Sequence, residues 1–97
     1  MPHWTRAQRF DRDYAKLPAD VKRRFHDVVR TSFVPDVDAG TFRPGLRVKR
    51  VRGTRGVFEM TFAPDGRATW EYGPPREPGV PHVRWRRIGS HDVLGDP

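Results

Sequence analysis

The strongest structural signal in this sequence of 97 residues lies in Val57-Phe-Glu-Met-Thr-Phe-Ala-Pro-Asp-Gly-Arg-Ala-Thr-Trp-Glu-Tyr72. On both sides of Pro64-Asp65-Gly66, apolar and polar residues alternate with the period of two that is typical of a half-buried strand. Proline presets the first central position of a turn and glycine tolerates positive φ, so these three residues predict a tight turn. The sequence therefore predicts an antiparallel hairpin, with its apolar residues on one face.

Two further strands are expected on either side of this hairpin. Residues 46–51 alternate in part, and residues 82–88 place Val83 and Trp85 on one face. Between the hairpin and the last strand, residues 73–81 contain four prolines and two glycines, which predict an irregular exposed loop. The chain then closes with a turn and a short helical tail over residues 89–94.

The N-terminal third of the chain has the spacing of helices. Thr5-Arg-Ala-Gln8 resembles a capping box, so a first helix is expected to begin at Thr5 and to end near Pro18. A second helix is expected to run to about residue 33, because apolar residues recur at helical intervals. Residues 34–45 are rich in Pro, Gly and Asp and are expected to form a loop. A strand at residues 3–5 has little support.

These elements predict one α+β domain over residues 1–97, with two N-terminal helices packed on one face of a small antiparallel sheet. The helices are expected to cover the large apolar side chains of the sheet: Phe58, Met60, Phe62, Trp70, Tyr72 and Trp85. The opposite face is expected to stay open and to be rich in charge: Glu59, Arg67, Thr69, Glu71, Arg84 and Arg86. Function is expected on that open face.

Charge points to a polyanionic partner. Nineteen Lys and Arg residues against twelve Asp and Glu residues give a formal net charge of +7, and sixteen of the nineteen are arginine. A GC-rich genome explains part of the arginine preference, but it does not explain the net excess. Nucleic acid is the first expectation, an acidic protein the second and a membrane surface the third.

Other classes of protein are disfavoured by what the sequence lacks. It has no cysteine, no apolar run long enough to cross a bilayer, no signal-like start and no His/Cys cluster with metal-ligand spacing. A cytoplasmic protein without a membrane segment, metal or cofactor is therefore expected.

Six basic side chains are candidates for RNA cleavage without a metal: Arg67, His82, Arg84, Arg86, Arg87 and His91. Such cleavage needs a base for the 2′-hydroxyl, an acid for the leaving 5′-oxygen and cations for the phosphorane. Histidine can take either proton role. Arg67 begins one strand, while Arg87 and His91 end another, so the three are expected to converge at one edge of the sheet.

Each candidate also has an ordinary structural interpretation. Arg67 can be a solvated strand end, His91 a turn residue bonded to Asp92, and His82 a plain surface residue. Glu59 and Glu71 can simply balance arginines, or one of them can be a catalytic carboxylate.

Five segments together resemble the RelE/ParE superfamily of toxins, including its YafQ-like members. The segments are residues 10–18, 46–53, 56–62, 67–72 and the ending Arg87-Ile-Gly-Ser-His-Asp-Val-Leu94. The resemblance implies two helices on a twisted antiparallel sheet, an mRNA endonuclease that often acts at the ribosome, and a cognate acidic antitoxin.

Carried over by position, the resemblance implies that Arg67 stabilises the phosphate and His91 is the general acid. Arg87 and Lys49 would be supporting cations. The expected RNA-binding residues are Lys49, Arg50, His82, Arg84 and Arg86. The further histidines and the aspartate of YafQ-like toxins have no clear equivalents here, and the 73–81 loop is longer than is usual in that family. The general base is therefore left unassigned.

Two alternatives stay open. A ParE-like protein would inhibit DNA gyrase by binding it, without an acid/base pair, and His91 argues against this interpretation. A non-catalytic module would bind RNA with a strong salt dependence and cut nothing.

Overall fold

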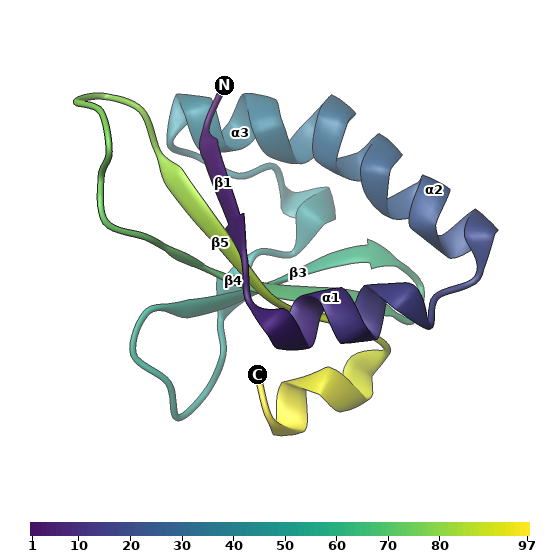
Figure 1. Ribbon diagram of the computed structural model, residues 1–97. Coiled ribbons are helices and arrows are strands. Elements are labelled where there is room, and N and C mark those ends of the chain that lie inside the picture. The colour runs from purple at the N-terminus through teal and green to yellow at the C-terminus, as the bar shows by residue number, and fades with distance from the viewer.

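The computed structural model describes residues 1–97 and contains five strands and three α-helices (Figure 1). In chain order these are β1 (His3–Arg6), α1 (Gln8–Ala15), α2 (Ala19–Val28), α3 (Val34–Ala39), β2 (Lys49–Arg50), β3 (Val57–Ala63), β4 (Gly66–Tyr72) and β5 (His82–Gly89). A π-helical turn, η1 (Val29–Phe33), joins α2 to α3, and two short 3-10 helices are η2 (Pro44–Leu46) and η3 (His91–Gly95). None of the helices has the length and apolar character that crossing a membrane requires.

The five strands form one sheet in the order β1-β5-β4-β3-β2. The predicted hairpin is confirmed: β3 and β4 are antiparallel, with Phe58 opposite Trp70 and Met60 opposite Ala68. The prediction of a wholly antiparallel sheet is wrong, because β1 pairs with β5 in parallel. The α+β class is confirmed, but the helices follow a first strand rather than opening the chain.

The capping box expected at Thr5 does not form. Thr5 lies in β1, where it pairs with Arg84 and its Oγ1 is 2.9 Å from Nε2 of His82. Helix α1 begins at Gln8, and the residue before it, Ala7, offers no side-chain cap. Pairing in the sheet therefore takes priority over the local capping signal, and it delays the helix by a few residues.

The loop expected from residue 34 is in part a helix. Helix α2 continues through η1 into α3, which ends only at Gly40, in the left-handed conformation with φ 77°. Pro35 lacks an amide hydrogen and its ring crowds the preceding turn of an α-helix. The wider π-helical turn just before it and its own place in the first turn of α3 accommodate both problems.

The core lies between the sheet and α2–α3, which Figure 1 shows along one side of the sheet. Phe33 of η1 is its centre, with ring centroids 5.1 Å from those of both Trp70 and Trp85. Burying aromatic side chains of this size supplies most of the stabilising area in so small a domain. Tyr72, expected to be covered, is 47% exposed because it lies at the end of β4.

The face expected to be open is partly covered. Residues 90–97, which include η3, fold back across β4 and β5 on the side opposite α2–α3 (Figure 1). Thr69 is fully buried as a result, and Val93 of η3 is 7% exposed. The part of this face near β2, β3 and the start of β4 forms a concave surface.

Candidate functional site

A groove of about 560 Å³ lies where β2, β3, β4 and η3 meet. We call it the basic groove. It is lined by Arg47, Lys49, Arg50, Val51, Arg52, Glu59, Thr61, Arg67, His91 and Leu94. Five of these side chains are cations and one is a carboxylate, so the groove is strongly positive. An extended polyanion such as single-stranded RNA is the kind of ligand that such a surface attracts.

Strand β2 and the loops beside it supply most of the positive charge. Lys49 and Arg50 form the two-residue edge strand, and both are exposed. Arg47 precedes them in the left-handed conformation, with φ 49°, and it is the only non-glycine residue with positive φ. Such a backbone is costly for a residue with a Cβ and is often found at functional sites. Here it turns the chain from η2 into β2 and brings the Arg47 side chain to the groove.

Arg67 is held in place by the turn of the hairpin. Its Nη1 lies 3.3 Å from the carbonyl oxygen of Ala63, 3.4 Å from that of Pro64 and 3.1 Å from that of Gly66. A single guanidinium nitrogen makes all three contacts, and Nε and Nη2 make no hydrogen bond within the protein. The guanidinium group is therefore pre-positioned, with donors left over for an anion in the groove.

His91 lines the groove at the start of η3. Its amide donates to Oδ1 of Asp65 at 3.3 Å, and the Oγ of Ser90 caps η3 by accepting from the amide of Asp92. The imidazole makes no hydrogen bond within the protein and is exposed. It is therefore available to a ligand in the groove, and the alternative interpretation of His91 as a turn residue whose ring is bonded to Asp92 is not supported.

The two strand carboxylates considered from the sequence lie in different surroundings. Glu59 lines the basic groove with a side chain that is 9% exposed, and its Oε1 is 3.7 Å from Nζ of Lys49 on the neighbouring strand. Glu71 lies outside the groove and forms an ion pair with Arg86. Of the two, Glu59 alone shares a groove with Arg67 and His91.

The expected convergence of Arg87 with Arg67 and His91 does not occur, because Arg87 is taken up by α1. Its Nε donates to Oδ2 of Asp13 at 2.6 Å and its Nη2 to Oδ1 at 3.2 Å. This hydrogen bonding to Asp13 raises the pKa of the Arg87 guanidinium. The group is therefore committed to joining α1 to β5 and does not line the groove.

The remaining predicted RNA-binding residues also lie outside the basic groove. Arg84 is exposed beside β1, and Arg86 is bonded to Glu71 and to the carbonyl oxygen of Pro97. His82 is 6% exposed, with Nε2 against Thr5 and Nδ1 2.8 Å from the carbonyl oxygen of Pro74. This pairing fixes His82 as a clamp between β1 and the 73–81 loop, so the expectation of a surface histidine is corrected.

Sequence reasoning missed two cations of the groove, Arg47 and Arg52. The signal that could have found them is the density of arginines in Arg47-Val-Lys-Arg-Val-Arg-Gly-Thr-Arg55, which surrounds the edge strand. Alternation alone does not reveal them, because both lie just outside β2.

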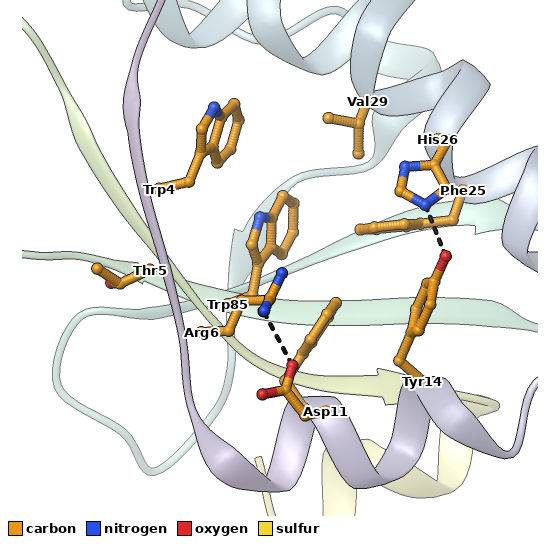
Figure 2. A pocket seen from close by; sticks show the side chains of 10 residues that line it. Trp4, Thr5, Arg6, Asp11, Tyr14, Phe25, His26, Val29 and Trp85 are labelled. Carbon is orange, nitrogen blue, oxygen red and sulfur yellow. Dashed lines mark hydrogen bonds and ion pairs between the residues drawn. The ribbon is translucent and has the colours of Figure 1, made fainter.

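A second concavity of about 740 Å³ lies between β1, α1 and α2, and Figure 2 shows its side chains. Its walls are largely aromatic: Trp4, Phe10, Tyr14, Phe25 and Trp85. Arg6 is the only Lys or Arg residue that lines it, and its Nε is bonded to Asp11 at 2.9 Å. At the nearby pair of Tyr14 and His26, 2.7 Å apart, Nζ of Lys22 lies 5.1 Å from the centroid of the Tyr14 ring. This pocket is mainly apolar and is lined by one cation where the basic groove is lined by five, so the basic groove is the better candidate site for a phosphate.

Comparison with known proteins supports the fold but assigns no activity. No protein-family model and no curated protein matches the sequence. The solved structures that match include the RelB-RelE antitoxin-toxin complex from Methanococcus jannaschii, with a TM-score of 0.61 at 13% identity over 95% of each chain. The YoeB/ParE toxin from Agrobacterium tumefaciens gives a TM-score of 0.65 at 11% identity, covering 92% of this chain and 98% of that one. The DinJ-YafQ complex from E. coli gives 0.60 at 10% identity, covering 97% and 98%. The chain is thus similar in fold to RelE/ParE-type toxins, YafQ included, as its sequence motifs predicted.

Proposed function

We propose that this protein, which has the fold of RelE/ParE-type toxins, is the toxin of a toxin–antitoxin pair and that it cleaves RNA in the basic groove. The observation that carries the proposal is the composition of that groove. A histidine, a carboxylate and five cations line one surface that is open to an extended ligand. Those are the groups that cleavage by the neighbouring 2′-hydroxyl requires.

The reaction uses two proton transfers. Glu59 accepts the proton of the 2′-hydroxyl, whose oxygen attacks the adjacent phosphorus. The bond from phosphorus to the 5′-oxygen breaks, and His91 in its protonated form donates a proton to that oxygen. The products are a 2′,3′-cyclic phosphate and a free 5′-hydroxyl. Each proton transfer contributes about 10²–10⁴ in rate when the donor or acceptor is well placed.

The cations of the groove stabilise the charge that develops on the phosphorane. Arg67 is the main candidate, because its guanidinium is already oriented and keeps two nitrogens free of protein partners. Lys49 and Arg50, with Arg47 and Arg52, bind the flanking phosphates along the strand. In this proposal Arg67, His91 and Lys49 have the roles that the sequence resemblance implied, Arg50 has the RNA-binding role expected from the sequence, and Glu59 is the base. Arg87, Arg84, Arg86 and His82 are left out of the site.

The natural substrate in this proposal is mRNA, bound alone or on the ribosome, and the place of action is the cytoplasm. An acidic antitoxin is the proposed protein partner. The charge of +7 and the exposed cations of the basic groove favour an acidic segment that covers the groove and competes with RNA.

The test is to map the ends of RNA after incubation with the purified protein, with and without translating ribosomes. Wild-type protein is expected to produce 2′,3′-cyclic phosphate ends, and His91→Ala is expected to lower the rate by about 10²–10⁴. His3→Ala is the matched control, since His3 is bonded to Glu77 at the far end of β1 and β5. His3→Ala is expected to cut like wild type.

Together with a gyrase supercoiling assay and an RNA-binding titration of the same protein, this experiment separates three outcomes. Cleavage that persists unchanged in His91→Ala contradicts the assigned site. Intact RNA together with blocked supercoiling by gyrase favours a ParE-like inhibitor, and intact RNA that is bound without any effect on gyrase favours a binding module.

A further inference from the structure

Three arginines converge on residues 96 and 97, which follow η3. Nη2 of Arg9, on α1, donates to Oδ2 of Asp96 at 2.7 Å and to its carbonyl oxygen at 3.1 Å. Nη1 of Arg87 donates to the same carbonyl oxygen at 3.0 Å. Nε of Arg86 donates to the carbonyl oxygen of Pro97 at 3.0 Å. We call Arg9, Arg86 and Arg87 the arginine clamp.

The clamp depends on an irregularity in β5. The register between β4 and β5 shifts so that Thr69 is opposite Arg87 and Trp70 is opposite Trp85, which leaves Arg86 as the extra residue. A bulge of this kind redirects the side chains around it. Here it lets two consecutive arginines reach residues 96 and 97. Asp13 then fixes Arg87 from the other side.

The clamp lies at one end of the segment that carries His91. Near the other end, the His91 amide is bonded to Asp65. Between them, Val93 packs so tightly on Gly89 that a Cβ on that glycine would lie 3.0 Å from Cγ1 of Val93. Because the His91 imidazole has no hydrogen bond of its own within the protein, its position depends on how the whole 90–97 segment is seated.

We propose that the arginine clamp positions His91. Arg9 is the member to test, because its side chain binds only Asp96, whereas Arg86 and Arg87 also bind Glu71 and Asp13. This inference rests on the proposed function, because it takes His91 to be the general acid. A general acid must be held within hydrogen-bonding reach of the leaving oxygen, and a displacement of about 1 Å can cost about 10²-fold in rate. Three arginines of a basic protein are thus used to hold its own chain and not to hold RNA.

Arg9→Ala tests the proposal, with Arg12→Ala as the matched control. Arg12 lies on the same helix and carries the same charge, and its side chain makes no hydrogen bond or ion pair. The first measurement is hydrogen exchange at the amides of Val93 and Asp96, which donate to the carbonyl oxygens of Ser90 and Val93. Arg9→Ala is expected to speed exchange at both by roughly fivefold, since it removes two hydrogen bonds that a charged group donates. The global unfolding midpoint and Arg12→Ala are expected to stay at wild-type values.

The second measurement is the rate of RNA cleavage as a function of pH. Arg9→Ala is expected to lower kcat by about tenfold with little change in KM, and to weaken the fall in rate at high pH that loss of a protonated acid produces. Arg9→Lys, which keeps a donor, is expected to recover part of the rate.

The proposal fails if exchange at Val93 and Asp96 is unchanged, or if exchange accelerates while kcat and its pH profile do not. It also fails if Arg12→Ala behaves as Arg9→Ala does. Hydrogen exchange is measured without RNA. If the protein cuts no RNA, the proposed function is refuted, but exchange still tests whether Arg9 holds residues 90–97 in place.

Discussion

Replacing Glu59 by Gln separates catalysis from binding more sharply than any other change in the basic groove. The side chain is 9% exposed and faces Nζ of Lys49 at 3.7 Å. Glutamine keeps the shape and the hydrogen-bonding capacity of the side chain but removes the charge and the ability to accept a proton at neutral pH. The same substitution should therefore slow cleavage and strengthen binding.

Both magnitudes follow from the structure. Loss of a general base is expected to lower kcat by about 10²–10⁴. Glu59 is the only carboxylate against five cations in the groove, so its removal ends the competition for Lys49 and strengthens the phosphate contact of Lys49 by up to the equivalent of one full contact. One added phosphate contact on a single strand steepens the dependence of log K on log salt by about 0.7. If the variant and the wild type bind equally at 1 M salt, the variant is expected to bind RNA roughly fivefold more tightly than the wild type at 0.1 M.

The assay combines single-turnover cleavage of a labelled RNA with a binding titration at several salt concentrations. Glu77→Gln is the control, because Glu77 is a carboxylate in the 73–81 loop with a side chain that is 62% exposed. Wild-type cleavage in Glu59→Gln would refute its role as the base. Weaker binding would refute the electrostatic account of the groove.

Two further predictions concern the stability of the fold. The hydrogen bonds from Arg43 lower the pKa of the Asp36 carboxyl below its ordinary value of 3.8. A lowered pKa in the folded state means that this pair stabilises the protein fully above pH 3.8 and that the contribution is lost as the pH falls through the folded-state pKa. Urea titrations from pH 5 to pH 2 should show that the unfolding free energy falls with pH in wild type and falls less in Arg43→Ala. An equal fall in the two proteins would contradict the prediction. Gly73→Ala would place a Cβ 2.5 Å from Nδ1 of the buried His82 ring, so it is expected to cost about 1–3 kcal/mol of unfolding free energy. Gly45→Ala, where a Cβ meets nothing within 4 Å, is the control, and equal midpoints for the two variants would show that the clash is relieved without cost.

Elements built from local signals could be predicted from the sequence. The hairpin over residues 57–72 has a turn whose residues are specific for it and strands that alternate in sequence, and the structure confirms the antiparallel pairing. Burial does not alternate as the sequence does, because Val57, Glu59 and Thr69 of the other face are buried too. The irregular 73–81 loop and the strand at residues 82–88 were likewise predicted from proline content and alternation. The net positive charge that favours a polyanionic partner is a property of composition and needs no coordinates.

Tertiary structure decided which charges are free. Arg67 and Arg87 both lie near the end of a predicted strand. Arg67 lines the groove, whereas Arg87 is hydrogen-bonded to Asp13, a residue 74 positions away. Glu59 and Glu71 differ in the same way. Whether a guanidinium or a carboxylate is available depends on partners brought near by strand order and by the bulge in β5, and no local pattern encodes these long-range pairings. Likewise, β1 became a strand and Thr5 lost its capping role because a parallel partner, β5, was available across the sheet. The sequence alone determined the charge, the hairpin and the class of fold, whereas only the folding of residues 90–97 over β4 brought His91 to the groove that Arg67 and Glu59 line.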